Sequence, residues 1–121
     1  MLKVGTDIVS IHRIERSIEH FGERFLRRYL NPGEYSPKSR SSSLAGYWAA
    51  KEAVAKALGC GIGSELGFHD ILLHKNSKGA PSFTLSEEAM RRFPIAESSL
   101  SISHDGGFAI AVVVIVLSAE C

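Results

Sequence analysis

Glu52 and Lys56 are the two residues of this sequence with the clearest chemical potential. They lie four residues apart in an alanine-rich segment, which places both side chains on one face of a helix. A carboxylate and an ammonium group arranged in this way can hold a metal ion and offset charge on a leaving phosphate. The alternative is an exposed ion pair that stabilises the helix by about 0.3 kcal/mol. Spacing alone favours the exposed ion pair.

A second carboxylate, Asp7, follows Gly5 and Thr6 where a short strand is expected to pass into a helix. There it could cap the helix N-terminus, which is the commoner role, or bind a cation. Asp7 and Glu52 together would supply the one or two carboxylates that Mg²⁺ usually takes from a protein. An ammonium group beside that metal, such as that of Lys56, would suit a pyrophosphate ligand.

Two further segments are weaker candidates. Gly61 lies in the glycine-rich turn 59–63, which follows a predicted helix instead of opening one, so a plain helix C-cap is as well supported as a turn that a ligand approaches. His104 follows Ser101-Ile102-Ser103 at the exit of a predicted strand. Without a Gly-x-Ser-x-Gly elbow, a Ser–His hydrolase has little support. A phosphate-binding histidine and a structural one are then comparable interpretations.

The composition excludes several broad classes of protein. With 121 residues and a formal net charge of +1, the chain predicts one domain, 1–121, and has no global charge for binding nucleic acid or an anionic membrane. Its two cysteines, Cys60 and Cys121, form no CxxC pair, so we expect neither a disulfide framework nor a zinc site, and we expect a cytoplasmic protein. The longest apolar run, 108–117, is shorter than the roughly 18 residues of a membrane span, and we expect no signal peptide.

Four arginines define a candidate docking surface on the first predicted helix. After a short strand at 2–5, apolar residues recur in steps of three and four from Ile8 to Phe25 and predict a helix. The opposite side of this helix carries the four, Arg13, Arg16, Arg24 and Arg27. The arginine stripe requires the helix to run through Gly22. A solvated helix face is the alternative, and the residue pattern alone favours it.

The other elements are expected around a second helix at 44–58, capped by a preceding serine and ended by Gly59. In chain order they are strands at 69–75 and 80–85 joined as a hairpin, a short helix from Ser86 to Arg92, and strands at 100–103 and 108–117 joined by an Asp-Gly-Gly turn. The last strand is too uniformly apolar for an open face, so we expect it to lie centrally, between layers or against another subunit. The predicted fold is α+β, with antiparallel strands packed with a long helix.

Three segments, taken in order, resemble the bacterial holo-acyl-carrier-protein synthases, a family of 4′-phosphopantetheinyl transferases. They are Val4-Gly5-Thr6-Asp7-Ile8-Val9; Leu44-Ala45-Gly46 followed by Ala49-Ala50-Lys51-Glu52-Ala53-Val54-Ala55-Lys56-Ala57 and Gly61-Ile62-Gly63; and Ser101-Ile102-Ser103-His104. Phe68-His69-Asp70-Ile71 and Gly79-Ala80-Pro81 also fall where the family has a Phe-x-Asp-Ile strand and a Gly-Lys-Pro turn. The resemblance runs nearly from end to end, and the ordered set is far more specific than any one motif.

The resemblance implies an enzyme of fatty acid biosynthesis with the small single-domain fold of that family. It would transfer the 4′-phosphopantetheine group of coenzyme A to a serine of apo-acyl carrier protein and release adenosine 3′,5′-bisphosphate. The implied cofactor is Mg²⁺, bound by Asp7 and Glu52. Lys56 would contact the phosphates and stabilise the leaving group. The serine proton would pass to Glu52 or to a metal-bound water.

The resemblance also implies how the two substrates are bound. The residues implied to line the coenzyme A site, besides Lys56, are Gly61, Pro81 and His104, with His104 near the nucleotide phosphate. Those implied to dock the acidic carrier protein are Arg13, Arg16, Arg24 and Arg27, of which Arg13 matches the family's docking arginine. The family forms trimers with active sites at subunit boundaries, so a homotrimer is expected, and its assembly would cover the apolar strand at 108–117.

Two positions depart from the family pattern. Tyr47 stands where the family usually has an arginine that helps to bind the 3′-phosphate of coenzyme A, and Ala80 replaces the usual lysine of the turn beside the adenine site. Arg40, another basic residue or a neighbouring subunit would have to supply the missing charge. The departures leave an alternative function open, a non-catalytic module that binds nucleotide or carrier protein on the same scaffold. A metal-dependent pyrophosphohydrolase is a more remote alternative.

Overall fold

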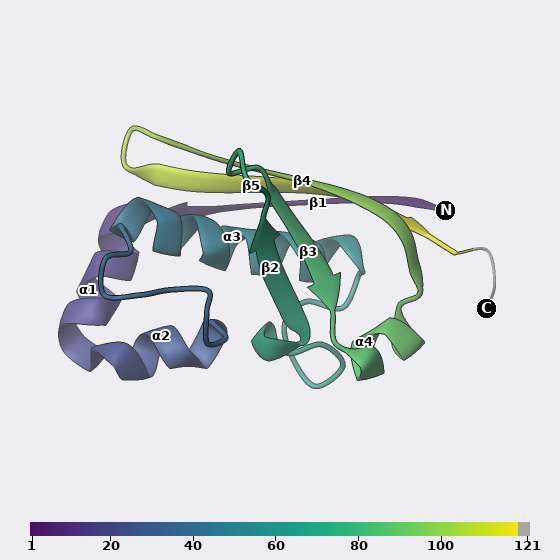
Figure 1. The fold of residues 1–121 in the computed structure, drawn as a ribbon, viewed down its shortest axis with the longest axis horizontal. Coiled ribbons are helices and arrows are strands. Elements are labelled where there is room, and N and C mark those ends of the chain that lie inside the picture. The colour runs from purple at the N-terminus through teal and green to yellow at the C-terminus, as the bar shows by residue number, and fades with distance from the viewer. Residues whose placement is uncertain (119–121) are drawn as a thin grey trace.

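The computed structural model describes residues 1–118, and Figure 1 shows its ribbon. Its elements are β1 (Leu2–Ser10), α1 (Ile11–Phe21), α2 (Glu23–Tyr29), α3 (Ser41–Ala57), the 3₁₀ helix η1 (Phe68–Asp70), β2 (Ile71–Lys75), β3 (Pro81–Leu85), α4 (Glu87–Arg92), β4 (Ile95–Asp105) and β5 (Phe108–Leu117). A three-stranded antiparallel sheet covers one side of α3, and β2 and β3 form a separate antiparallel hairpin. The α+β fold of antiparallel strands packed with a long helix is therefore as predicted.

β5 is the central strand of the larger sheet, whose order is β1-β5-β4. Its side chains alternate between two faces, as strand geometry requires. Those buried on the α3 side are Ala109, Ala111, Val113 and Ile115. The other face is open in the single chain, where Val112 is 40% exposed and Phe108 is 50% exposed. The predicted central position of the strand is confirmed, and its second apolar face is left uncovered.

Glycine at position 5 lets β1 lie directly on α3. A Cβ atom there would collide with the carbonyl oxygen of Ala53 and would lie only 2.8 Å from the backbone nitrogen of Ala57. On the same face of the helix, seven residues before Ala53, a Cβ atom at Gly46 would lie 2.8 Å from Cγ2 of Ile102 in β4. These close approaches need residues without a side chain. They bring the strand residues after Gly5 within reach of the α3 side chains.

The first strand is longer than predicted, and the first helix begins later. β1 pairs with β5 from Leu2 to Ser10, so Ile8 lies exposed on a strand and is not the first residue of a helical stripe. Ser10 caps α1, because its hydroxyl accepts a hydrogen bond from the Arg13 N–H. The capping role considered for Asp7 is therefore wrong: Asp7 lies inside the strand, opposite Ala111 of β5.

The helix does not run through Gly22. This residue has a φ of 59°, its N–H donates to the carbonyl of Ile18, and it ends α1 before α2 begins at Glu23. A positive φ interrupts the helical backbone, so the condition for one continuous arginine stripe is not met. Arg13 and Arg16 lie on α1, whereas Arg24 and Arg27 lie on α2.

The later elements follow the sequence prediction with shifted ends. α3 begins at Ser41, three residues early, and its N-cap is Arg40 with no side-chain hydrogen bond, so the predicted serine cap is wrong. Residues 69–70 belong to η1 instead of a strand, and β4 extends from 95 to 105. The Ser86 cap is confirmed, since its hydroxyl accepts from the Ala89 N–H, and Gly106 and Gly107 make the β4–β5 turn with positive φ.

Aromatic side chains pack α2 against α3 and η1. Phe25 stacks on Trp48 with ring centroids 5.8 Å apart, and Trp48 lies 5.0 Å from Phe68. Tyr29 is fully buried among these rings, and its hydroxyl donates to the Leu44 carbonyl oxygen at 2.9 Å. Burial raises the pKa of this tyrosine far above its ordinary value. The cluster holds the N-terminal half of α3 in place.

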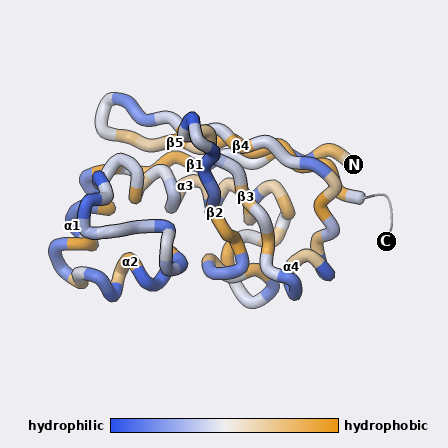
Figure 2. Tube along the Cα trace, viewed as in Figure 1, coloured by the Kyte–Doolittle hydropathy of each residue, from blue (hydrophilic) through white to orange (hydrophobic). Residues whose placement is uncertain are grey.

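The surface of the described residues is polar at its loops. Figure 2 shows hydrophilic colour at the tips of both hairpins and hydrophobic colour along much of the larger sheet. No helix within residues 1–118 has both the length and the apolarity that crossing a bilayer requires. Cys60 is a free thiol, and Cys121 lies outside the described residues.

Candidate active site

Asp7, Glu52 and Lys56, which are distant in sequence, lie together in the structure. The Nζ atom of Lys56 donates to Oδ1 of Asp7 at 2.8 Å and to the backbone oxygen of Thr6 at 3.2 Å. The close packing of Gly5 against α3 sets this geometry, because it places Asp7 beside the last turns of the helix. The Lys56 side chain is about half exposed, whereas that of Asp7 is only 15% exposed. The cluster therefore opens to solvent on the lysine side.

Glu52 is half-buried beside this ion pair. Burial raises the pKa of its carboxyl group, and the negative charge of Asp7 raises it further. Lys56 and Arg13 act in the opposite direction, but the net shift of the Glu52 pKa is upward. The hydrogen bond from Lys56 to Asp7 also raises the pKa of the ammonium group, which keeps it charged at neutral pH. The simple surface ion pair between Glu52 and Lys56 is not what the structure contains, since Lys56 pairs with Asp7.

Two carboxylates that repel each other form a suitable donor set for a hard divalent cation. Asp7 and Glu52 lie close enough for the charge of Asp7 to contribute to the raised pKa of Glu52. No group of three or more His, Cys, Asp or Glu side chains suited to a metal occurs among residues 1–118. A site with two carboxylates fits Mg²⁺, which keeps several water ligands and takes others from phosphate oxygens, better than it fits Zn²⁺.

His104 is not brought to this cluster within one chain. It lies exposed on β4 opposite Ala109, and β5 separates it from β1, which carries Asp7. β4 and β1 form the two edges of the sheet, and Tyr47 lies nine residues before Lys56, so the two side chains leave α3 on opposite flanks, Lys56 on the β1 flank with Asp7. Helix α3 thus separates two groups of predicted site residues.

Pro81 lies on the β4 flank of α3, in the β2–β3 hairpin. It pairs with Lys75 in the strand ladder, and the Lys75 ammonium lies 5.3 Å from the centre of the Tyr47 ring. This cation–π contact joins the hairpin to α3 at the position where the family pattern is broken. Lys75 is a residue that the sequence analysis did not select, and its spacing from Tyr47 contains no signal that would have found it.

Gly61 lies just beyond the end of α3. Its φ is 66°, and its N–H donates to the carbonyl of Ala55 at 3.2 Å, so it takes part in closing the helix. A Cβ atom at Gly61 would meet nothing within 4 Å. The C-cap interpretation therefore holds, and the open space beside the residue is compatible with a bound ligand as well.

The sequence analysis also missed a buried ion pair next to Glu52. Lys51 is completely buried, and its ammonium donates to Oε1 of Glu34 at 2.9 Å and to the backbone oxygen of Phe68 at 3.2 Å. Glu34 additionally accepts from the backbone N–H groups of Asn31 and Leu73. Burial lowers the pKa of Lys51, and Glu34 counteracts that shift. The signal was available, because Lys51 falls among the apolar residues on the core side of α3.

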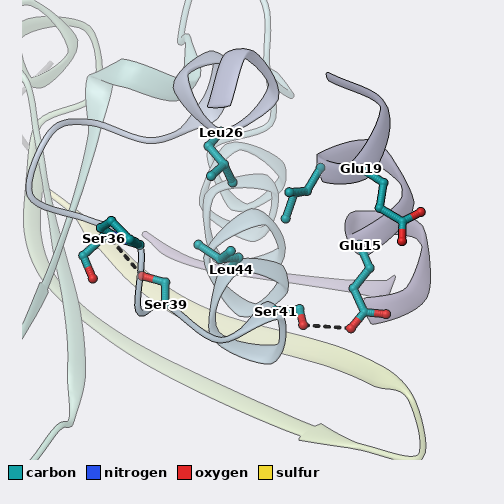
Figure 3. Close-up of a pocket in the computed structure, with 9 residues that line it drawn as sticks. Glu15, Glu19, Leu26, Ser36, Ser39, Ser41 and Leu44 are labelled. Carbon is teal, nitrogen blue, oxygen red and sulfur yellow. Dashed lines mark hydrogen bonds between the residues drawn. The ribbon is translucent and has the colours of Figure 1, made fainter. Parts of the chain in front are cut away.

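A separate groove of about 540 Å³ lies between α1, α2 and the start of α3. Figure 3 shows Leu26 and Leu44 pointing into this groove. At its rim the Ser41 hydroxyl donates a hydrogen bond to Glu15, and Glu19 lies beside Glu15. The two carboxylates make this rim negative, so the groove is a poor site for a phosphate ligand. The carboxylate–lysine cluster is the better candidate for the active site.

Comparisons with known proteins agree with the geometry. A model of the 4′-phosphopantetheinyl transferase superfamily matches residues 3–113. The holo-[acyl-carrier-protein] synthase of Sulfurovum sp. strain NBC37-1 is 58% identical over 114 residues, which are 94% of this chain and 96% of that protein. A crystal structure of the Helicobacter pylori synthase in complex with coenzyme A aligns with a TM-score of 0.90 and 54% identity, over 93% of this chain and 99% of that one.

A more distant structure agrees as well. The holo-[acyl-carrier-protein] synthase of Neisseria meningitidis aligns with a TM-score of 0.84 and 35% identity, covering 93% of this chain and 96% of that one. The similarity therefore extends over the whole fold and includes all the segments that carry Asp7, Glu52, Lys56 and His104. The resemblance first drawn from the ordered motifs is confirmed, and this chain belongs to the 4′-phosphopantetheinyl transferase superfamily.

Proposed function

We propose that this protein is a holo-acyl-carrier-protein synthase, which transfers the 4′-phosphopantetheine group of coenzyme A to a serine of apo-acyl carrier protein. The main observation in support is the contact between Asp7, on β1, and Lys56, on α3, with Glu52 beside them. Phosphoryl transfer depends chiefly on positioned positive charge around the phosphate, which Lys56 and a cation held by the two carboxylates would supply. Relatives that share most of the chain carry the same name.

In this reaction the serine hydroxyl oxygen of the carrier forms a bond to the phosphorus next to the pantetheine arm. The pyrophosphate P–O bond breaks, and adenosine 3′,5′-bisphosphate leaves with the bonding electrons. Asp7 and Glu52 would hold Mg²⁺, which would neutralise charge on the pyrophosphate. Lys56 donates hydrogen bonds to the leaving phosphate. Glu52, whose pKa burial raises, is the candidate acceptor of the serine proton.

The complete site is proposed to require more than one copy of the chain. His104 lies on β4, which β5 separates from the β1 strand that carries Asp7, and Pro81 lies on β3, which packs against β4. The open apolar face of the sheet supplies a surface for self-association, with Ile8 60% exposed on β1 beside the exposed side chains of β5. We propose a homotrimer in which one chain contributes the carboxylates and Lys56, and a neighbour contributes His104.

The carrier protein is proposed to dock on the arginines of the two N-terminal helices. Arg13 lies close enough to Glu52 to lower its pKa, so a carrier that contacts Arg13 would hold its serine near the cluster. Arg16, Arg24 and Arg27 are exposed and would extend this surface across the bend at Gly22. An acidic carrier would bind them less well as salt increases. The proposed compartment is the cytoplasm, and the process is fatty acid biosynthesis.

Mass spectrometry tests the proposal directly. Apo-acyl carrier protein incubated with the protein, coenzyme A and Mg²⁺ should gain one phosphopantetheine group, and chelation of the metal should stop the gain. Coenzyme A binding with no transfer would refute the proposal and favour the non-catalytic module, for which Tyr47 is the specific observation. Release of free phosphopantetheine without carrier protein would indicate a pyrophosphohydrolase instead.

A further inference from the structure

Lys75 differs from the two lysines of α3 that are engaged with carboxylates. Lys51 pairs with Glu34 and Lys56 pairs with Asp7, whereas Lys75 forms no carboxylate pair among residues 1–118. Its ammonium instead lies 5.3 Å from the centre of the Tyr47 ring. An aromatic face attracts a cation without neutralising its charge. Lys75 is therefore oriented while its positive charge remains available to an anion.

The position of this pair relates it to one group of site residues. The Tyr47 side chain leaves α3 on the side opposite Lys56, and strand β3 of the hairpin packs against β4, which carries His104. Lys75 pairs across the hairpin with Pro81. The pair thus belongs to the β4 flank of α3, together with two residues that are predicted to line the coenzyme A site. Within residues 1–118, no other lysine or arginine is held over an aromatic ring.

Coenzyme A carries two separate anionic groups, the pyrophosphate and the 3′-phosphate monoester on the ribose. The Asp7, Glu52 and Lys56 cluster accounts for the pyrophosphate, which leaves the monoester in need of a cation. We propose that Lys75, oriented by the Tyr47 ring, binds the 3′-phosphate of coenzyme A and makes the protein specific for the 3′-phosphorylated nucleotide. This inference rests on the proposed function, and it assigns the missing charge at position 47 to the β2–β3 hairpin.

Calorimetric titration of the full chain gives a readout that does not need turnover. The probes are adenosine 3′,5′-bisphosphate and adenosine 5′-monophosphate. We expect Lys75→Ala to weaken binding of the bisphosphate about tenfold, as for loss of a charged hydrogen bond, and to leave the monophosphate unchanged. Lys75→Arg should keep the preference for the bisphosphate. Equal weakening of both nucleotides, or no weakening of either, would overturn the inference.

Matched variants separate the role of the ring from that of the charge. Tyr47→Phe keeps the aromatic face and should retain the preference, whereas Tyr47→Leu removes the face and should reduce the preference. Lys78→Ala removes a nearby exposed lysine from the same hairpin and should change nothing. A loss as large in Lys78→Ala as in Lys75→Ala would show only a general effect of charge and would contradict the proposal.

The kinetic counterpart compares coenzyme A with its 3′-dephospho form. Lys75→Ala should raise KM for coenzyme A with little change in kcat, and should leave KM for dephospho-coenzyme A unaltered. A wild-type chain that prefers the bisphosphate through Lys75 but transfers nothing to the carrier would refute the proposed function and support this inference. Normal transfer to the carrier, with no effect of Lys75→Ala on KM for either substrate, would support the proposed function and refute this inference.

Discussion

Opposing electrostatic effects act on the pKa of Glu52. It is half-buried, it lies near the like charge of Asp7, and it is balanced by Lys56 and Arg13. Such an arrangement costs stability in the free protein, because burial and Asp7 both disfavour the charged carboxylate. A divalent cation between the two carboxylates would relieve that repulsion. The unfavourable electrostatics are thus consistent with a site for binding rather than for folding.

The variant Glu52→Gln tests this role at nearly constant side-chain size. We expect it to lower transfer to acyl carrier protein by at least about 100-fold, since both metal binding and proton acceptance are lost. The thermal unfolding midpoint should be unchanged or slightly higher, because a disfavoured charge is removed. The exposed Glu97→Gln on β4 is the control and should be fully active. Full activity of Glu52→Gln would be incompatible with the proposed mechanism.

Asp70 provides a pH-dependent contribution to stability. Its carboxylate accepts from the Gly67 N–H at 2.9 Å and from the Ser86 hydroxyl at 2.7 Å, and these bonds hold its pKa below the ordinary value of 3.8. A depressed pKa stabilises the fold at pH values above about 4, and the stabilisation is lost as the carboxylate is protonated at lower pH. The group therefore links η1 to the cap of α4 most strongly at neutral pH.

Asp70→Asn should accordingly lower the free energy of unfolding by about 1 kcal/mol at pH 7. The difference from wild type should become smaller as the pH falls from 7 to 3, because protonation of Asp70 begins below its ordinary pKa of 3.8. Urea unfolding at the two pH values measures it, with the exposed Asp105→Asn as a control. A deficit that is the same at both pH values would mean that the charge of Asp70 is not what stabilises the link.

At the scale of elements, α3 is held at its two ends and on two sides. Gly5 allows β1 to touch its backbone, the aromatic cluster around Tyr29 covers its first half, and Lys51 joins its middle to Glu34 and η1. Since Glu52 is the next residue after Lys51, the direction of its side chain depends on this buried pair. The ion pair thus helps to hold the turn of α3 that carries Glu52 in the proposed site.

Breaking the pair from one side leaves an uncompensated charge in the core. Lys51→Met should lower the free energy of unfolding by about 3 kcal/mol, because Glu34 remains only 6% exposed without its ammonium partner. The double variant Lys51→Met with Glu34→Gln should recover part of that loss. Chemical denaturation of the single and double variants measures the coupling. A loss of less than about 1 kcal/mol in the single variant would contradict a strongly coupled buried pair.

The elements were more predictable than their ends and their long-range contacts. The Ser86 cap, the Asp-Gly-Gly turn and the apolar central strand have local signals, and each was found from the sequence. The prediction that the first helical stripe begins at Ile8 was wrong. The spacing of Ile8 from later apolar residues matches a helix, although Ile8 lies on a strand that pairs with β5. That Asp7 lies near Glu52 followed from the ordered motifs, since no local rule joins residues so far apart, but the direct ion pair of Asp7 with Lys56 was not predicted. The cation–π contact of Lys75 with Tyr47 was not predicted, because neither a local rule nor a motif joins these two residues.

At the scale of the whole molecule, the sheet leaves an apolar face uncovered in a single chain. Exposed hydrophobic residues on β1 and β5 form this face, whereas their neighbours on the other side are buried under α3. A face of this kind on a small domain is typical of a subunit interface. In the proposed trimer, the two groups of predicted site residues on opposite flanks of α3 would meet between chains.

Mixed assemblies provide a sharp test of shared sites. Glu52→Gln and His104→Ala chains should each have low activity alone. Co-expressed in equal amounts, they should recover about one quarter of wild-type activity, because a random neighbour pair combines the intact Glu52 and the intact His104 in one case of four. Each variant mixed with itself is the control. No recovery in assemblies shown by mass to contain both chains would exclude a site shared between subunits.

Helix α3 carries residues of two different active sites on its two flanks in the proposed trimer, so it can couple them. One flank of this rigid helix carries Glu52 and Lys56, and the other carries Tyr47 with Lys75 against it. In the proposed trimer these flanks serve different active sites, so any small rotation or shift of α3 on ligand binding changes two sites at once. Occupancy would then be transmitted around the ring through the helix itself, and coenzyme A saturation would depart from independent binding.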